Sequence, residues 1–547
     1  MTIATPVAPT RSGGWPVDVL LVALLTLPWL WPFASGPTPS VMPRLVSLAC
    51  GVLFLLVFQA TRPGHDLAGL LTKALLVAAL VSGVIGLLQY FGASSALAPW
   101  VNVTVPGYAF GNLRQRNQLG SLLNIGLAVL VWSAWTRQFR AAIDARPDLG
   151  AGRPATWRAG AKVVGPLLLA LVLLVGANAA TTSRTGLVQL VALLVLALVW
   201  RRQAAPGTWA ILGGAVLIYA LASVLLPLLA GMDPFASGIA ARFSDGGQSC
   251  ESRIILWHNV LQLIAQKPWF GWGWGELDYA HFITLYPGAR FCDILDNAHN
   301  LPLHLAVELG VPVAAVFCGL VAWLVVRARP WREVDVDRQM AWAVLAMIAL
   351  HSMLEYPLWY GPFQVTTLLA VWILWRTPPR RAGTVVEPSQ AERAPAPAPA
   401  LRQGSGLSAL VATCAVLLLL ALAYAAWDYR RVSQIYLAPS LRASAYREHT
   451  MEKIQDSWMF QNQVRFAELT LTTVTPDNAA HVYASAGALL HFSPESRVVE
   501  KRIDSALVLG RDDEAAYYML RYRNAFPAEF ARWEQRASYG PLPKIDP

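Results

Sequence analysis

Long apolar runs recur along most of this chain, and they constrain its fold more than any other feature of the sequence. About eleven of them have roughly 17 to 25 residues, enough for a helix to cross about 30 Å of hydrocarbon. They lie near residues 17–34, 41–60, 69–91, 117–136, 162–180, 185–200, 207–230, 301–326, 339–354, 361–376 and 406–427. The sequence therefore predicts an all-α, polytopic integral membrane protein with about eleven transmembrane helices.

The composition agrees with a membrane protein. Of 547 residues, 55% are hydrophobic and only 14% are charged, and the mean hydropathy is +0.44. Such values are atypical of soluble domains. The net charge of +10 is compatible with nucleic-acid binding. However, the Lys and Arg residues form short clusters between apolar runs, where they are expected to set membrane topology. We therefore expect a lipid bilayer as partner and no nucleic acid.

The positive clusters predict an orientation. A cytoplasmic N-terminus places the Arg residues within 137–162, 327–332 and 376–381 on the cytoplasmic side, where positive charge is favoured. The first apolar run has no persuasive cleavage site, so we expect it to be a retained helix. The exported segments are then 92–116, 181–185, about 231–300, and everything after about 428.

The chain is expected to divide into five parts. The tail carries short amphipathic patterns, including one from Trp458 to Leu471, which predict paired helices in a soluble domain. The APAPAPA run indicates a low-complexity linker. The predicted parts are N-terminal transmembrane helices (1–92), a transmembrane core with the exported loop 231–300 (93–376), a cytoplasmic Pro/Ala-rich linker (377–405), a last transmembrane helix (406–427) and an exported helical domain (428–547).

Two of the five cysteines, Cys250 and Cys292, fall in the long exported loop. An oxidising compartment would permit a disulfide between them, and the alternative is two unrelated free thiols. The other cysteines lie inside predicted helices as small apolar residues. No CxxC or HxxxH spacing accompanies the loop cysteines, so we expect no metal site.

A cluster of polar residues precedes an apolar run in the stretch DNAHNLPLHLAVELG at 296–310. Asn300 is a plausible N-cap, and Pro302 fits the first helical turn. His299 would then lie at the positive end of a helix dipole, which disfavours imidazolium and favours a bound anion. His299 is therefore a candidate general base beside a phosphate, and the alternative is a histidine that only completes the helix start.

Two further polar residues, His304 and Glu308, lie four residues apart on one face of the same predicted helix. They are expected either to line a polar cleft or to make hydrogen bonds between helices.

Several arginines lie on the exported side, close to the hydrocarbon. Guanidinium groups bind phosphate through two parallel hydrogen bonds, which would suit a lipid-linked diphosphate at headgroup level. The alternative for each of them is anchoring to lipid headgroups. These arginines are Arg114, Arg116, Arg184, Arg242 and Arg253. An amphipathic helix over about 253–266, followed by a Trp-rich turn, is expected to lie in the membrane interface.

Four segments carry a resemblance to a known family. SRTG at 183–186, SR followed by Trp257, KPWFGWGWG at 267–275 and HNLPLHLAVELG at 299–310 together resemble the O-antigen ligase/polymerase superfamily. FGNLRQRNQLG at 110–120, HSMLEYPLWY at 351–360 and the soluble tail look more like its bacterial O-linked protein oligosaccharyltransferases, the PglL type that glycosylates pilins. The likeness spans roughly residues 100–365.

The resemblance implies an activity and a site. His299 would serve the acceptor reaction, while Arg184 and Arg253 would hold the donor diphosphate. The reaction would move a glycan from an undecaprenyl diphosphate carrier to Ser or Thr hydroxyls of periplasmic proteins such as type IV pilin. It would occur at the bacterial inner membrane, with the C-terminus in the periplasm and without metal or cofactor. The supporting candidates are Arg114, Arg116, Arg242, Asn297, Asn300, Glu308, Glu355 and Tyr356.

Two rival functions are left open. Within the same chemistry, the rivals are ligation of O-antigen to the lipid A core and O-antigen polymerisation. Outside it, the rival is a membrane transporter or lipid flippase. A transporter is expected to carry ionisable residues at the midplane of several helices, whereas most of those here lie at the exported face.

Overall fold

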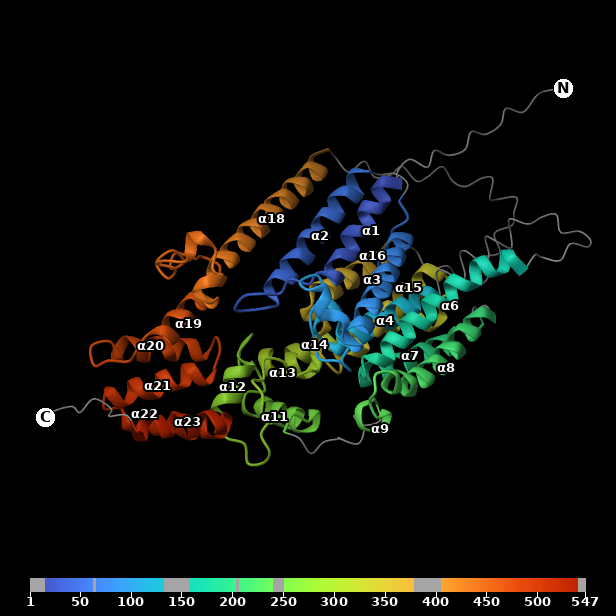
Figure 1. Cartoon of the computed structure of the whole chain (residues 1–547). Coiled ribbons are helices and arrows are strands. Elements are labelled where there is room, and N and C mark those ends of the chain that lie inside the picture. Colours follow the sequence, from blue (N-terminus) through green and yellow to red (C-terminus); the bar gives the residue numbers. More distant parts are fainter. Residues whose placement is uncertain are drawn as a thin grey trace, which may run out of the picture.

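The computed structural model describes residues 15–61, 65–131, 157–202, 206–239, 250–377 and 405–539. Within these residues every regular element is a helix. Figure 1 shows a bundle of long helices from the first two thirds of the chain, a set of shorter helices from the C-terminal part, and α18 running between them. The chain is therefore an all-helical membrane protein, as its apolar runs predict.

The helical bundle contains α1 (Trp15–Leu30), α2 (Val41–Ala60), α3 (Leu67–Tyr90), α4 (Arg116–Val129), α6 (Trp157–Ala180), α7 (Arg184–Val199), α8 (Pro206–Leu229), α14 (Val311–Ala328), α15 (Val336–Ser352) and α16 (Gly361–Arg376). The helix between the bundle and the C-terminal helices is α18 (Ser405–Val432). The outer segments are α9 (Pro234–Ser237), α11 (Arg253–Gln266), α12 (Leu277–Ile283) and α13 (Leu301–Leu309). Short 3-10 turns lie at Ala93–Leu97, Gly111–Leu113, Pro330–Arg332, Pro357–Trp359, Ser433–Tyr436, Pro439–Leu441 and Ser444–Tyr446. Leu71, Leu75, Leu119 and Leu122 are fully buried where α3 and α4 pack at the centre of the bundle.

Five helices in the described residues are long and apolar enough to cross a membrane. They cover Val41–Ala60, Leu67–Tyr90, Gly207–Leu229, Val311–Arg332 and Ala409–Tyr436. The other expected runs also coincide with helices, but these helices are shorter or less apolar. In α4 the reason is visible in the sequence, because Asn117, Gln118 and Asn124 interrupt its apolar residues.

The expectation of one continuous helix over 301–326 is wrong. Gly310, with φ of 89°, separates α13 from α14. A Cβ atom at Gly310 would lie 2.2 Å from the carbonyl oxygen of Trp269, so no larger residue fits without a shift. The N–H of Val311, at the start of α14, donates to the carbonyl oxygen of Pro268 at 2.8 Å. The break is therefore made by close backbone contact with the turn that follows α11.

The same turn completes the end of α13. Trp272 donates its N–H to the carbonyl oxygen of Val307 at 2.9 Å, and Gly273 donates to that of Glu308 at 3.0 Å. These carbonyls have no partner inside a helix that ends here. At Gly271, with φ of 69°, a Cβ would lie 2.4 Å from the carbonyl carbon of Glu308. The glycine-rich turn at 269–275 and the end of α13 at 308–310 are thus packed closely against each other.

Residues 250–300, called the outer loop below, have a small hydrophobic core of their own and a disulfide bond. α11 begins and ends where the amphipathic pattern predicts, and Leu256 and Val260 on its inner face pack against Leu277 and Leu295. Cys250 and Cys292 are joined by a disulfide with a Cα–Cα distance of 5.4 Å. The link closes the segment around α11 and α12.

The C-terminal helices are α19 (Gln461–Leu471), α20 (Ala479–Leu490), α21 (Ser496–Val508), α22 (Asp512–Ala525) and α23 (Pro527–Tyr539). Neighbours along the chain pack on one another, as the amphipathic patterns predict. The apolar pattern from Trp458 to Leu471 ends where α19 ends, but Trp458 precedes the helix. Trp458 and Leu471 are exposed, so the buried face of α19 extends only from Val464 to Leu469.

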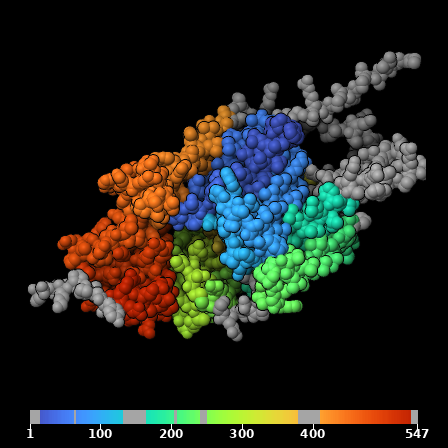
Figure 2. All heavy atoms as spheres, viewed as in Figure 1, coloured from blue at the N-terminus to red at the C-terminus, as the bar shows by residue number. Residues whose placement is uncertain are grey.

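The outer loop lies between the C-terminal helices and the bundle on the face seen in Figure 2. Phe282 of α12 belongs to the same core as α19 to α23. Arg521 donates from Nε to the carbonyl oxygen of Ile283 at 2.8 Å. His491 pairs with Glu276 at 2.7 Å. The C-terminal helices therefore support the loop directly.

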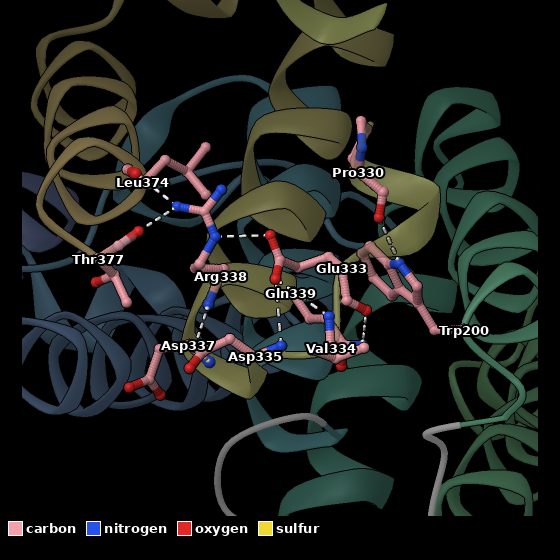
Figure 3. Close-up of polar contacts among 10 residues, drawn as sticks. All are labelled: Trp200, Pro330, Glu333, Val334, Asp335, Asp337, Arg338, Gln339, Leu374 and Thr377. Atoms are coloured by element: carbon pink, nitrogen blue, oxygen red, sulfur yellow. Dashed lines mark hydrogen bonds and ion pairs between the residues drawn. The ribbon is translucent and has the colours of Figure 1, made fainter. Parts of the chain in front are cut away.

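A buried ion pair holds the helix ends at one end of the bundle. Arg338 donates from Nε to Glu333 at 2.6 Å and from Nη1 to the carbonyl oxygens of Leu374 and Thr377 (Figure 3). Trp200 donates to the carbonyl oxygen of Pro330 at 2.8 Å in the same view. These contacts join the end of α7, the start of α15 and the end of α16.

Candidate active site

The turn after α15 meets the outer loop at His299. His299 has a φ of 51°, a left-handed conformation that is uncommon for a residue other than glycine. Its N–H donates to Oδ1 of Asn297 at 2.9 Å. Asn300 caps α13 through Leu303 N–H at 3.1 Å and donates from Nδ2 to the carbonyl oxygen of Met353 at 2.9 Å. The two asparagines therefore hold His299 in an unusual turn, tied to the residues that follow α15.

The turn brings His299 to a buried carboxylate, Glu355. Nδ1 of His299 lies 2.8 Å from Oε2 of Glu355, whose side chain is only 3% exposed. Arg253 donates to Oε1, and Asn117 donates from Nδ2 to the same oxygen at 3.1 Å. Burial by itself would raise the pKa of Glu355, but the hydrogen bond from His299, its charge and that of Arg253 together hold the pKa below its usual value. Glu355 is therefore an ionised acceptor at the centre of the cluster.

The carboxylate decides which nitrogen of His299 carries the proton. An ionised carboxylate only accepts hydrogen bonds, so Nδ1 must be the protonated nitrogen. In the neutral imidazole Nε2 is then the acceptor. No hydrogen bond to Nε2 is formed within the described residues. The ring of Tyr356 lies edge-on to the imidazole, 4.8 Å away. The arrangement leaves His299 oriented, with one nitrogen available to accept a proton.

Two residues that the sequence did not single out extend this cluster. Ser183 donates from Oγ to Oδ1 of Asn117 at 2.6 Å, which turns the amide of Asn117 so that its nitrogen faces Glu355. Ser183 is also the N-cap of α7 and accepts the N–H of Gly186 at 2.9 Å. Both lie inside motifs already noted, RQRNQ and SRTG, but neither spacing indicates that they meet.

The arginines differ in how they relate to the cluster. Arg253, whose side chain is 35% exposed, is in ion contact with Glu355, so it is not a free diphosphate ligand, although its outer N–H groups have access to solvent. Arg184 is the first residue of α7, directly after Ser183. Its side chain is exposed and pairs with no residue that the structure describes. A phosphate group beside His299 would meet Arg253 first.

The remaining candidate arginines are Arg114, Arg116 and Arg242. Arg114 is exposed and donates to the carbonyl oxygen of Ala34 at 2.7 Å. Arg116 is half-buried, with its guanidinium 5.1 Å from the ring centre of Tyr108. Arg242 lies outside the described residues. The hydrogen bond of Arg114 thus goes to the chain before α2 and not to the cluster.

Glu308 belongs to a separate polar pair. Its Oε2 lies 3.4 Å from Nε2 of His304, and both side chains are buried in α13, before the membrane span that begins at Val311. Burial raises the pKa of Glu308 to about 7 and lowers that of His304 to about 4. The ring of His304 packs against Trp359, 4.9 Å away. This pair supports the packing of α13 and has no direct bond to His299.

A further buried network lies beneath Glu355. Ser121 of α4 contacts Nδ1 of His351 at 2.8 Å and donates to Gln189 of α7 at 2.9 Å. Gln189 donates in turn to the carbonyl oxygen of Met347 at 2.9 Å. These bonds tie α4, α7 and α15 together below the cluster. Among the residues that the structure describes, no three His, Cys, Asp or Glu side chains gather in a way that would hold a metal ion.

Three family models match separate parts of the chain. Residues 109–132 match a protein glycosylation ligase family, residues 169–318 match the O-antigen ligase family, and residues 339–539 match a family described as the C-terminal part of virulence factor membrane-bound polymerases. The chain is a member of the O-antigen ligase superfamily. Each match contains part of the cluster: Asn117 lies in the first, Arg253 and His299 lie in the second, and Glu355 lies in the third.

Among the curated relatives, two are described as O-oligosaccharyltransferases and one as an O-antigen ligase. A general O-oligosaccharyltransferase of Acinetobacter baylyi is 28% identical over 131 residues, 23% of this chain and 21% of the relative. A ComP-specific O-oligosaccharyltransferase of the same organism is 25% identical over 114 residues, 21% of each chain. An O-antigen ligase of Pseudomonas aeruginosa is 30% identical over 177 residues, 32% of this chain and 36% of the relative. The matching segments thus span between about a fifth and a third of these relatives.

Proposed function

We propose that this protein transfers a glycan from an undecaprenyl diphosphate carrier to Ser or Thr hydroxyls of periplasmic proteins such as pilin. The observation that carries the proposal is the oriented imidazole of His299, with Nδ1 on Glu355 and Nε2 open, beside the guanidinium of Arg253. A base next to a fixed cation suits a reaction in which a hydroxyl loses a proton and a diphosphate departs.

The step balances with these residues alone. The acceptor oxygen attacks the anomeric carbon of the donor glycan, and a new glycosidic C–O bond forms. The bond from that carbon to the diphosphate oxygen breaks, and the electron pair leaves with the diphosphate. The hydroxyl proton passes to Nε2 of His299, while Glu355 stabilises the resulting imidazolium through Nδ1. Arg253 and Arg184 would neutralise the charge that develops on the leaving diphosphate.

The proposed setting is the bacterial inner membrane, with about eleven membrane-crossing helices, a cytoplasmic N-terminus and a periplasmic C-terminus. One contact supports this arrangement. Tyr429, near the end of α18, donates to the carbonyl oxygen of Thr38 at 2.7 Å, and Thr38 follows the first helix, which a cytoplasmic N-terminus would direct outward. A reporter that is active only in the periplasm, fused after Pro547, should be active. The proposed division of the chain is 1–92, 93–376, 377–405, 406–427 and 428–547.

Transfer by the purified protein tests the proposed function. The protein in nanodiscs is incubated with a lipid-diphosphate-linked glycan and a candidate pilin, and intact mass spectrometry measures the pilin. The expected result is a mass increase equal to the glycan on a serine or threonine. His299→Ala, prepared in parallel, should reduce transfer by about 10²-fold or more. Undiminished transfer by a well-folded His299→Ala protein would refute the role given to His299.

Ligation of O-antigen to the lipid A core is a second candidate. It is favoured by the match to the P. aeruginosa O-antigen ligase, which is longer than the matches to the two oligosaccharyltransferases. The same base would then take its proton from a sugar hydroxyl. Offering lipid A core and pilin in one reaction separates the candidates, because the label enters either the lipopolysaccharide or the protein.

A further inference from the structure

A short turn of the C-terminal part, residues 456–460 with the sequence DSWMF, is fastened to the end of α18 by a buried carboxylate. Asp428 is fully buried and accepts three hydrogen bonds: from Nε of Arg431 at 2.8 Å, from Oγ of Ser457 at 2.9 Å and from the N–H of Met459 at 3.2 Å. Arg431 also donates to Asp456 at 2.8 Å. The turn is therefore held against α18 at both of its ends.

In the turn held by these bonds, the side chains of Trp458 and Met459 point outward. Phe460 is buried against Tyr429 of α18, with ring centres 5.0 Å apart. Between the buried Ser457 and Phe460, Trp458 is 79% exposed and Met459 is 50% exposed. A single exposed aromatic residue is common on protein surfaces. Two adjacent exposed apolar side chains, Trp458 and Met459, on a turn held by hydrogen bonds and an ion pair indicate a contact surface.

Contacts with α18 show the level of this turn along the membrane helix. The ring of Trp458 lies 6.3 Å from that of Tyr424, which in turn lies 5.6 Å from Trp427. Tyr424 and Trp427 are exposed residues at the end of the apolar stretch of α18, which stops at the charged residue Asp428. They are three residues apart, about 4.5 Å along the helix axis. Trp458 is therefore level with the end of the membrane-crossing part of α18.

The exposed residues of α18 indicate that the turn is in contact with lipid. Leu417 and Leu420 are also exposed and belong to the candidate span Ala409–Tyr436, where the surrounding medium is lipid. Tyr and Trp side chains are enriched where hydrocarbon meets headgroups. In Figure 1 the segment between α18 and α19 lies beside the lower part of α18. The surface from Leu420 through Tyr424 to Trp458 is thus continuous with the lipid-facing side of α18.

We infer that the 456–460 turn is a membrane-interface anchor, in which Trp458 and Met459 insert among phospholipid headgroups and the first acyl carbons. The anchor sets the height of the C-terminal helices above the bilayer. Because those helices pack on the outer loop through Arg521 and His491, it also braces the loop that presents Arg253 and His299. The inference does not depend on which acceptor the protein uses.

Site-specific photocrosslinking tests the anchor in the full chain. Trp458→p-benzoylphenylalanine protein in phospholipid nanodiscs is irradiated, and mass spectrometry measures phospholipid adducts. The matched control carries the same residue at Leu520, a 50% exposed position on α22. Adducts at position 458 should exceed those at 520 by about tenfold or more. Equal adduct yields at the two positions, or a crosslink from 458 to a protein partner in native membranes, would overturn the inference.

A second measurement needs no substitution. Hydroxyl-radical footprinting of the native protein in nanodiscs compares the oxidation of Trp458 with that of Tyr517, which is 43% exposed on α22. Lipid cover predicts that Trp458 is oxidised several-fold less than Tyr517, although its side chain is more exposed on the protein surface. Oxidation of Trp458 equal to or above that of Tyr517 would contradict the anchor.

Discussion

Nδ1 of His299 lies 2.8 Å from Oε2 of Glu355, although 56 residues separate them in the chain. The same carboxylate also accepts hydrogen bonds from Arg253 and Asn117, so four residues from three distant segments meet at one buried group. The outer loop supplies Arg253 and His299, α4 supplies Asn117, and the turn after α15 supplies Glu355. This meeting point defines the candidate active site more sharply than any single motif.

Replacing the carboxylate tests whether it orients the imidazole. Glu355→Gln keeps the size of the side chain but removes the negative charge, so it no longer stabilises an imidazolium or selects the Nδ1–H form of His299. We expect glycan transfer to fall by about 10²-fold with little change in the KM for the donor. Single-turnover kinetics in nanodiscs measure both. A variant with unchanged kcat and a raised KM would assign Glu355 to donor binding instead.

The same carboxylate predicts a pH dependence of stability. Its pKa in the folded protein is below the usual value, because the contacts with His299 and Arg253 outweigh burial. A lowered folded-state pKa contributes stability above the unfolded-state pKa, and this contribution is lost as the pH falls through the folded-state value. The unfolding midpoint of the native protein should therefore exceed that of Glu355→Gln at about pH 7, and the difference should shrink below about pH 4. A difference that stays constant over this range would show that the ionised form is not stabilised.

The two arginines are expected to respond differently. Arg253→Ala leaves the buried Glu355 without its cation and should lower stability by about 1–3 kcal/mol as well as transfer. Arg184→Ala should leave the unfolding midpoint unchanged, because its side chain pairs with no described residue, while raising the KM for the lipid-diphosphate donor. Lysine should rescue either position poorly, since it has no planar fork for phosphate. Thermal unfolding and donor titration of the four variants separate these effects, and a lysine variant with full activity would argue against two-point phosphate binding.

Gly310 is expected to tolerate no side chain. Gly310→Ala places a Cβ 2.2 Å from the Trp269 carbonyl in a residue with positive φ, so the contact between the glycine-rich turn and α13 must open. We expect the free energy of unfolding to fall by about 1–3 kcal/mol. Glycan transfer should fall as well. Gly319→Ala is the matched control, because a Cβ there meets nothing within 4 Å. Equal unfolding midpoints for the two variants would contradict the close packing.

The disulfide is expected in protein isolated from the membrane. Non-reducing peptide mapping should recover Cys250 linked to Cys292, which are 42 residues apart. Their joint replacement by serine should destabilise the outer loop by about 2–4 kcal/mol, with a loss of transfer, because the loop also presents Arg253. Recovery of both residues as free thiols would exclude the oxidised state and, with it, one argument for the periplasmic placement of the loop.

Much of the local structure could be predicted from the sequence. The apolar runs coincide with helices because a backbone in hydrocarbon must satisfy its own hydrogen bonds, and the cap at Asn300 follows from its side chain and Pro302. These properties depend on residues near in the chain. The sequence predicted His299 as a catalytic candidate from its position before that helix and from the family resemblance. The structure shows that its hydrogen-bond partner is Glu355.

Contacts between distant segments were decided by the tertiary structure alone. The break at Gly310 depends on a carbonyl of Trp269, about forty residues earlier, and hydropathy carries no information about such backbone contacts. Glu355 could be noted as a candidate, but its hydrogen bonds to His299, Arg253 and Asn117 require three-dimensional geometry. The sequence by itself thus determined which segments form helices and which polar residues are unusual. The packing of the outer loop on α4 and on the turn after α15 determined which of those residues act together, because hydrogen bonds form over about 3 Å and the chain distance between partners does not predict them.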